Sequence, residues 1–399
     1  AGVSMEKDRL KITGGSPLQG EITASGNKNA VLPILAASLL AEDEVVLENV
    51  PDIRDVRIML DLLGEIGVDI SQDGGTVTLR PEHLRTSDLP ATLCRQIRTS
   101  ILFAAPLLVR RGQAQLHWPG GDMIGRRRLD AHFYGLRAMG VEIDEGTLHF
   151  DAPRGLTGRD LFFDEASVTA TEHVLMAAVR AQGVTTIRNA ASEPHVQDLA
   201  RFLQKMGADI DGINTNTLTV RGVDYLRGCR HRIVSDHIEV GSFLALAAAT
   251  GGSVTVRDTV RTHYWMINRV FRRFGLELQF CRDSVRLPPG QTAEIQVDSG
   301  GQMPRVDDGP WPQFPSDLMS VMLVLATQSR GTVLFFEKMF ESRMYFVDPL
   351  IQMGANIIVC DPHRVVVSGQ TPLRGLSLRS PDIRAGMALL AAAACAEGQ

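Results

Sequence analysis

The chain has 399 residues, 44% of them hydrophobic and 22% charged, with a formal net charge of −5, a composition typical of a folded globular protein that is long enough for two domains. The negative charge argues against a nucleic-acid-binding protein, and no apolar run approaches the roughly 18 residues that a membrane span requires. Five scattered cysteines without CxxC spacing argue against a disulfide framework and a zinc site, so we expect a cytoplasmic protein without a metal or other cofactor.

An apolar, alanine-rich segment that runs into a turn and a short strand-like run recurs along the chain. Its small residues predict a closely packed helix that ends at a glycine. A second helix that ends in a glycine follows, so each unit is predicted to run strand, helix, strand, helix, strand. Such a unit cannot bury its own apolar helix, and the copies must share cores. The six copies end, about 70 residues apart, at Asp43, Gly112, Gly183, Gly252, Gly331 and Gly398, and the second glycines are Gly67, Gly140, Gly207, Gly275 and Gly354.

The second copy carries an insertion. Gly140 follows Gly112 by 28 residues, whereas the same interval is 23 or 24 residues in the other copies. The extra length falls in WPGGDMIGRRRLDAH, residues 118–132, which presents Asp122 beside three consecutive arginines. Because the whole chain is acidic, this positive charge is expected to serve a local purpose.

Both ends of the sequence are unusual. The residues ahead of Met5 resemble a tag remnant, and no signal peptide follows them. The sixth copy stops one residue after Gly398. We expect this copy to be truncated, because a native half-unit would expose apolar surface.

Polar candidates lie at the entrances of the alanine-rich helices. SGNKNAVLP places Lys28 and Asn29 at a helix start, where backbone N–H groups and the helix dipole attract an anion. Ser167 and Thr169 open a helix in the third copy, and Asp317 follows a proline-rich approach in the fifth. Each position also fits ordinary helix capping or a solvated side chain, so the residues alone leave both interpretations open.

Five cations occupy comparable edges of the repeated units. Together with two carboxylates, they would suit a small and highly anionic substrate in a cleft between two domains. They are Lys28, Arg98, Arg127, Arg343 and Arg384.

The segments SGNKNAVLPILAASLLAE, PGGDMIGRRRLDAH and FPSD resemble the signatures of the enolpyruvyl transferases, the family of UDP-N-acetylglucosamine 1-carboxyvinyltransferase and 5-enolpyruvylshikimate-3-phosphate (EPSP) synthase. The likeness covers nearly the whole chain. It implies a two-domain, inside-out α/β barrel of six βαβαββ units, the sixth one truncated, with the active site between the domains. Residues 28–235 would form the inner domain, and residues 1–27 with 236–399 the other.

The implied reaction moves the enolpyruvyl group of phosphoenolpyruvate to the 3-hydroxyl of UDP-N-acetylglucosamine (UDP-GlcNAc) and releases phosphate, a step of peptidoglycan precursor synthesis. The implied partners are these two substrates, with no nucleic acid and no membrane, and the implied state is a monomer or a weak homo-oligomer.

The resemblance also implies roles for the phosphoenolpyruvate half of the site. Lys28 and Arg127 would hold phosphoenolpyruvate, supported by Arg98 and Arg384. The family usually has a cysteine where this chain has Asp122, and protonation of the methylene carbon is attributed to that side chain. A carboxylic acid with a raised pKa can deliver the same proton. Fosfomycin, which alkylates the family's cysteine, is then expected not to react.

For the acceptor half, the resemblance implies that Asn29 and Ser167 contact UDP-GlcNAc, with Thr169 beside them. Asp317 would act as general base at the 3-hydroxyl, and Arg343 would orient groups nearby. The loop that carries the acid would close over both ligands and exclude water.

Three positions depart from the family pattern, because Leu102, Arg128 and Thr169 stand where tryptophan, proline and glycine are usual. A further family arginine would lie beyond the end of the sequence. These departures keep other acceptors open, such as UMP or a shikimate phosphate. A catalytically silent nucleotide-binding relative and an RNA 3′-phosphate cyclase are alternatives outside this class, although the acidic balance argues against RNA.

Overall fold

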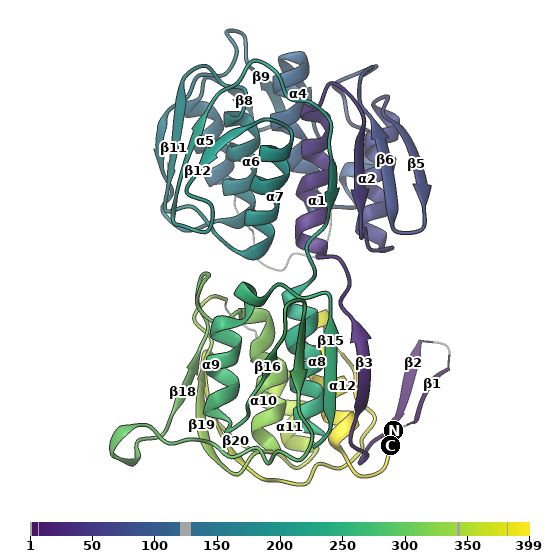
Figure 1. Ribbon diagram of the computed structural model, residues 1–399, viewed down its shortest axis with the longest axis vertical. Helices are drawn as coiled ribbons and strands as arrows, with labels where there is room; N and C mark the ends of the chain where they lie inside the picture. Colours follow the sequence, from purple (N-terminus) through teal and green to yellow (C-terminus); the bar gives the residue numbers. More distant parts are fainter. Residues whose placement is uncertain (1, 7, 120–128, 341–343, 381) are drawn as a thin grey trace. The chain divides into compact units, whose positions relative to one another are not determined.

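The computed structural model describes residues 2–6, 8–119, 129–340, 344–380 and 382–399. The chain forms two compact units, which are described separately (Figure 1). The inserted unit is Ser25–Val234, and the terminal unit joins Ala1–Ala24 to Ser235–Gln399. Among the described residues, no helix is long and apolar enough to cross a membrane.

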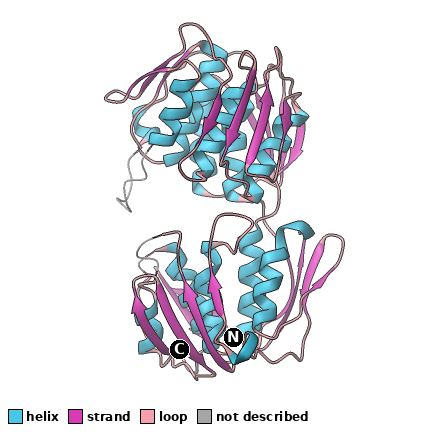
Figure 2. Cartoon of the chain, turned by 90° about the vertical axis from the view of Figure 1, so that its left-hand side faces the viewer, coloured by secondary structure: helices cyan, strands magenta, loops and turns pink. Residues whose placement is uncertain are grey.

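Alanine-rich helices form the centre of the inserted unit, and strands lie around them (Figures 1 and 2). A helix that is apolar on all sides is stable only when other elements surround it. Accordingly, residues 30–37 of α1 and 170–178 of α6 are all buried. The central helices are α1 (Lys28–Ala37), α4 (Ala104–Arg111) and α6 (Val168–Ala178), and the second helices are α2 (Arg54–Glu65), α5 (Asp130–Ala138) and α7 (Pro194–Lys205).

Three sheets complete the inserted unit, in the orders β10-β11-β13-β12, β14-β4-β6-β5 and β7-β9-β8. In the first sheet, β10 and β11 pair in parallel, and α6 connects them in the sequence. β12 and β13 follow α7 and form an antiparallel hairpin. The strands are β4 (Val45–Glu48), β5 (Asp69–Asp73), β6 (Thr76–Arg80), β7 (Gln113–Gln115), β8 (Glu142–Asp144), β9 (His149–Asp151), β10 (Asp160–Phe162), β11 (Val184–Arg188), β12 (Asp209–Asp211), β13 (Thr217–Arg221) and β14 (Arg230–Arg232).

The terminal unit repeats this plan. Its central helices pack together, since α10 contacts both α8 and α12. Its four-stranded sheets have the orders β16-β17-β15-β3 and β18-β19-β21-β20, and the hairpin β1-β2 lies against α12. The helices are α8 (His237–Ala249), α9 (Trp265–Arg273), α10 (Met319–Thr327), α11 (Val347–Gln352) and α12 (Ile383–Cys395), and the strands are β1 (Gly2–Glu6), β2 (Arg9–Thr13), β3 (Gln19–Thr23), β15 (Ser253–Arg257), β16 (Gln279–Phe280), β17 (Ser284–Leu287), β18 (Arg305–Asp307), β19 (Gly331–Phe336), β20 (Asn356–Asp361) and β21 (Arg364–Gly369).

One sheet in each unit is completed by a strand from a distant part of the sequence. β14 pairs in parallel with β4, and β3 pairs in parallel with β15. Without these strands, the first and fourth copies of the repeat would each lack the strand that precedes the first helix.

The repeated α/β plan predicted from the sequence is confirmed, with two differences. The alanine-rich helices were predicted to end at a glycine, and α4 does so at Gly112, but α6 ends at Ala178 and α10 at Thr327, ahead of Gly183 and Gly331, because the chain makes a further turn before the next strand. A unit runs βαβαββ, because the second helix is followed by a hairpin where the repeat alone predicted one strand. The recurring second glycines have a common cause. All of them adopt positive φ, between 69° and 110°, just after the second helix, a conformation that costs glycine little. They are Gly67, Gly140, Gly207, Gly275 and Gly354.

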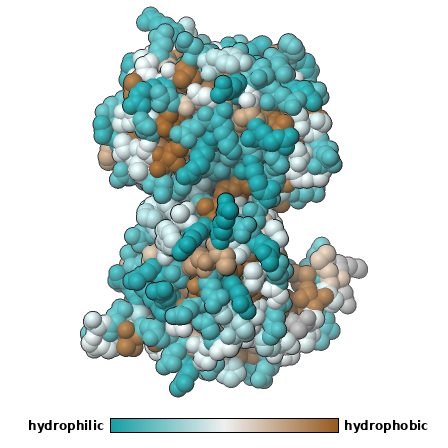
Figure 3. All heavy atoms as spheres, viewed as in Figure 1, coloured by the Kyte–Doolittle hydropathy of each residue, from teal (hydrophilic) through white to brown (hydrophobic). Residues whose placement is uncertain are grey.

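The surface seen in Figure 3 is mainly hydrophilic, with apolar residues in small separate patches. Among the residues that the structure describes, no group of three or more His, Cys, Asp or Glu side chains is arranged to hold a metal ion.

Candidate active site

The segment SGNKN forms the entrance to α1 in the inserted unit. Asn27 is the N-cap, and its Oδ1 accepts hydrogen bonds from the backbone N–H groups of Asn29 at 2.8 Å and Ala30 at 3.3 Å. Gly26 is required beside it, since a Cβ there would overlap the carbonyl oxygen of Asn49. Lys28 and Asn29 are therefore the first two residues of the helix, and their side chains are exposed. The cap is Asn27, which was not singled out from the sequence.

Lys28 makes an ion pair with an acid on the neighbouring helix. Its Nζ lies 3.1 Å from Oδ2 of Asp55, in the first turn of α2. The Lys28 side chain is 46% exposed and the Asp55 side chain 29% exposed. The lysine is thus held toward α2 yet remains accessible to an anion. Nothing in the sequence marked Asp55, because acids are common in the first turn of a helix.

Ser167 is the N-cap of α6, and its Oγ accepts a hydrogen bond from Ala170 N at 3.3 Å. Capping leaves the Ser167 hydroxyl proton available as a donor. Thr169, the second residue of α6, is half-buried, and its Oγ1 lies 3.1 Å from Nε2 of the buried His132. His132 is the last residue of the segment 118–132, in which Asp122 and the arginines, but not this histidine, were singled out from the sequence.

In the terminal unit, Asp317 lies in the short 3₁₀ helix η5 (Ser316–Leu318), which leads into α10. The N-cap positions of η5 and α10 are Pro315 and Leu318, so Asp317 does not occupy a capping position. It is half-buried.

A second carboxyl group lies near Asp317. Asp236, the N-cap of α8, has a pKa raised to about 6, mainly by burial. Hydrogen bonds from Ile238 N and Glu239 N oppose the rise, whereas the charges of Glu239 and Asp317 add to it. Three acidic residues, Asp236, Glu239 and Asp317, therefore lie close together in the terminal unit, whereas only Asp317 was singled out from the sequence.

A buried carboxylate supports the turn that carries Asp317. Glu337 is 1% exposed, and its oxygens accept from Ser316 Oγ at 3.1 and 3.0 Å and from Met339 N at 3.2 Å. Because Ser316 precedes Asp317 in the chain, Glu337 holds η5 in place. Sequence reasoning missed this residue.

Arg98 begins the 3₁₀ helix η2 (Arg98–Phe103) with an exposed side chain, whereas Leu102 in the same helix is fully buried in the core of the inserted unit. Leu102 therefore contributes to packing. Three other candidates, Asp122, Arg127 and Arg343, lie outside the described residues, as does Arg128, the position where the family usually has proline. Arg384 is in α12, but its side chain is also outside the description.

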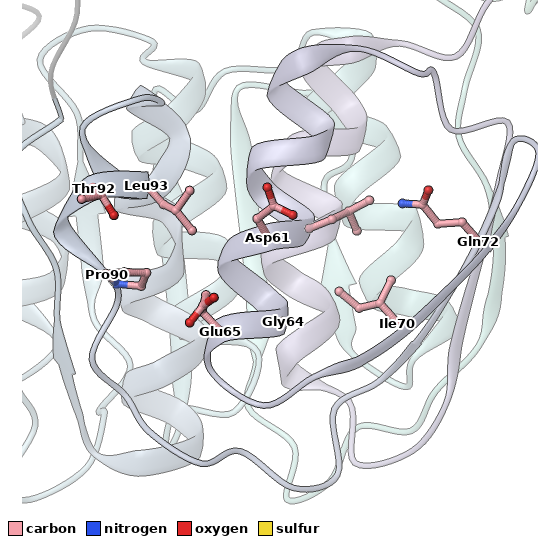
Figure 4. A pocket seen from close by; sticks show the side chains of 9 residues that line it. Asp61, Gly64, Glu65, Ile70, Gln72, Pro90, Thr92 and Leu93 are labelled. Carbon is pink, nitrogen blue, oxygen red and sulfur yellow. The ribbon is translucent and has the colours of Figure 1, made fainter.

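The inserted unit has a pocket of about 710 Å³ between α2, β5 and the short helix α3 (Ala91–Cys94) (Figure 4). Asp61 and Glu65 of α2 and Pro90, Thr92 and Leu93 line it among others. None of the candidate site residues is among its lining residues, so the pocket is separate from the helix entrances described above.

The family of the chain follows from its similarity to known sequences. The family described as EPSP synthase (3-phosphoshikimate 1-carboxyvinyltransferase) matches residues 12–399. The chain belongs to the EPSP synthase family.

Within the EPSP synthase family, several relatives are similar to this chain over almost its full length. The UDP-N-acetylglucosamine 1-carboxyvinyltransferase of Bradyrhizobium diazoefficiens is 51% identical over 97% of this chain and 90% of its own length. The protein of the same name from Borreliella burgdorferi is 49% identical over 97% of this chain and 91% of its own.

Two solved structures share the fold of this chain. The enolpyruvyl transferase NikO from Streptomyces tendae aligns with a TM-score of 0.84 at 22% identity, covering 97% of this chain and 91% of that one. An EPSP synthase from Acinetobacter baumannii aligns with a TM-score of 0.76 at 17% identity, covering 97% and 92%. The fold class expected from the resemblance is thereby confirmed.

Proposed function

We propose that the chain transfers the enolpyruvyl group of phosphoenolpyruvate to the 3-hydroxyl of UDP-GlcNAc and releases phosphate, as a step of peptidoglycan precursor synthesis. The observation that carries this proposal is the 51% identity to a UDP-N-acetylglucosamine 1-carboxyvinyltransferase over 97% of the chain. The two substrates are its partners, and it acts as a cytoplasmic monomer or weak homo-oligomer.

In this proposal, phosphoenolpyruvate is held by cations. The ion pair between Lys28 and Asp55 breaks, and the Lys28 ammonium group binds an anionic group of the substrate. This is possible because the Lys28 side chain is partly exposed. Arg127 binds the same ligand, with Arg98 and Arg384 supporting its charges. Charge-assisted hydrogen bonds of this kind are about twice as strong as neutral ones.

The acceptor is bound by Asn29, Ser167 and Thr169, with Arg343 orienting groups near the reacting carbon. Asp317 accepts the proton of the 3-hydroxyl group while the oxygen of that hydroxyl bonds to C2 of phosphoenolpyruvate. Asp122 gives a proton to the methylene carbon. The C2–O bond to phosphate then breaks, the departing phosphate takes up the proton held by Asp317, and the new methyl group returns one proton to Asp122. The C=C double bond is thereby restored in the enol ether, and both carboxyl groups regain their starting states. No metal or other cofactor is needed for these steps.

Asp122 also gives the proposal a pharmacological consequence. Alkylation of the family's loop residue by fosfomycin requires a soft thiolate nucleophile, and a carboxylate reacts far more slowly with an epoxide. The enzyme is therefore fosfomycin-resistant.

The test is phosphate release from phosphoenolpyruvate with and without UDP-GlcNAc, with UMP and shikimate 3-phosphate as competing acceptors. We expect release that depends on UDP-GlcNAc and yields its enolpyruvyl ether. Faster release with either competitor would reassign the acceptor, and no release with any acceptor would indicate a silent relative.

A further inference from the structure

Three side chains in the inserted unit form one continuous hydrogen-bonded chain. Thr169 Oγ1 on α6 lies 3.1 Å from His132 Nε2 on α5, and His132 Nδ1 lies 2.9 Å from His173 Nδ1, one turn further along α6. His173 Nε2 in turn accepts a hydrogen bond of 3.0 Å from the backbone N–H of Ala105 in α4. His132 is 3% exposed and His173 is 0% exposed.

Both imidazoles are neutral at physiological pH. Burial lowers the pKa of His132 to about 4. Burial, together with the neighbouring His132, lowers the pKa of His173 well below its ordinary value. In a neutral imidazole, one nitrogen is a donor and the other an acceptor.

The backbone end therefore determines the direction of every hydrogen bond in the chain. The Ala105 N–H can only donate, so His173 Nε2 is an acceptor and His173 Nδ1 carries the proton. That proton is donated to His132 Nδ1, which places the His132 proton on Nε2. His132 Nε2–H then donates to Thr169 Oγ1.

As a result, the hydroxyl proton of Thr169 is directed away from the histidines. None of the described residues accepts a hydrogen bond from this hydroxyl, and the side chain is half-buried at the entrance of α6 beside Ser167. A hydroxyl normally serves as donor or acceptor as its ligand requires. Here His132 occupies one of the two lone pairs of the oxygen and leaves the hydroxyl proton uncommitted, so Thr169 can offer a ligand a donor.

We propose that Thr169 acts as a donor to a charged diphosphate oxygen of the nucleotide sugar, and that His132 and His173 are positioning residues that hold Thr169 in this role. The inference rests on the proposed function, which supplies the nucleotide sugar. The diphosphate oxygens are the strongest acceptors on such a substrate, because a hydrogen bond to an anion is shorter and stronger than one to a neutral group.

The tautomers test the direction of the chain without any assay of activity. In the full-length protein labelled with ¹⁵N-histidine, two-bond ¹H–¹⁵N spectra near pH 7 distinguish the two protonated nitrogens. We expect His173 to be protonated on Nδ1 and His132 on Nε2. The opposite tautomer at His132 would make Thr169 the donor within the chain and would overturn the inference.

The kinetic test replaces Thr169 with valine, which keeps the shape and removes the hydroxyl. The KM for UDP-GlcNAc should rise roughly tenfold to a hundredfold, the loss expected for a hydrogen bond to a charged group. The KM for phosphoenolpyruvate should change much less. Thr169→Ser, which restores the hydroxyl, should recover most of the lost affinity.

His173 offers a matched pair of variants. His173→Asn can place an amide N–H near the position of Nδ1, where it donates to His132 and so preserves the direction of the hydrogen bonds towards Thr169, whereas His173→Leu supplies no donor. We expect UDP-GlcNAc affinity to fall in the leucine variant and to recover in the asparagine variant. An active Thr169→Val enzyme with unchanged KM for UDP-GlcNAc would overturn the inference, whereas a wild-type protein inactive with UDP-GlcNAc would overturn the proposed function itself.

Discussion

The ammonium group of Lys28 lies 3.1 Å from the carboxylate of Asp55, across the N-terminal ends of α1 and α2. Under the proposed function phosphoenolpyruvate replaces this carboxylate, so Asp55→Asn should lower the KM for phosphoenolpyruvate, by up to about fivefold for a partly exposed pair. Steady-state kinetics measure this change. Asp52→Asn is the control, since Asp52 is 82% exposed and pairs with Arg57 instead. A KM that rises tenfold in Asp55→Asn would show that Asp55 orients the lysine for binding.

Asp317→Asn should reduce turnover by about a hundredfold to ten-thousandfold, the range expected when a positioned base is removed. Binding of UDP-GlcNAc, measured by calorimetry, should persist, because the amide keeps the shape of the side chain. Asp348→Asn, an exposed acid in the first turn of α11, serves as the control in the same unit. A variant at position 317 that keeps more than half of the wild-type rate would exclude the role as base.

The unmodified enzyme should form no covalent adduct with fosfomycin in the presence of UDP-GlcNAc, as measured by intact-protein mass spectrometry. Asp122→Cys should form the adduct and retain turnover, because a thiol is a strong nucleophile and can also deliver a proton. Asp122→Asn cannot donate a carboxylic proton and should lose most activity. An adduct on the unmodified chain, or full activity in the asparagine variant, would contradict the assignment of Asp122.

The inserted unit should lose stability in acid because of His132. The pKa of His132 is about 4 in the folded chain and near 6.5 in the unfolded one, so between these values the unfolded state binds more protons. Stability therefore rises with pH across this window, and the cost at pH 4 is about 3 kcal/mol relative to neutral pH. Asp236 acts in the opposite sense in the terminal unit, since its pKa is raised to about 6 on folding.

Denaturant unfolding of wild type and His132→Asn from pH 4 to pH 7 isolates the contribution of His132, because all other titrating groups are shared. The difference in unfolding free energy between the two proteins should shrink as the pH falls. A difference that stays constant across the window would show that His132 is not held neutral by the fold.

The helices were predictable because their signals are local. An apolar or amphipathic run followed by a glycine, such as Gly112 after α4 or Gly207 after α7, identifies a helix and its end without reference to the rest of the chain, and both glycines adopt positive φ. In the hairpin β12-β13, β12 (Asp209–Asp211) coincides with the strand predicted after Gly207, whereas its partner β13 (Thr217–Arg221) was missed. The recurring landmarks stop at the second glycine, so the repeat did not mark β13, although its residues alternate between buried and more exposed positions. The pairing of β14 with β4 joins residues about 185 positions apart, and no local pattern encodes such a contact.

The helix entrances of the candidate site follow the same logic. Lys28, Ser167 and Asp317 could be located because the start of each helix is visible in the sequence. The partners of the site residues could not be located, because Asp55 meets Lys28, and His132 meets Thr169, only through the packing of neighbouring helices. The protonation state of His132 likewise depends on its burial, which the order of residues does not reveal.

The pairing of β3 with β15 has a consequence for synthesis on the ribosome. Residues 19–23 emerge early, but their partner, residues 253–257, emerges only after the whole inserted unit. The inserted unit receives its last strand, β14, and has every residue it needs while β3 of the terminal unit is still without its partner β15. Domains tend to fold as they emerge from the ribosome. The inserted unit is therefore the first to acquire a native core, and the terminal unit closes after it from both ends of the chain.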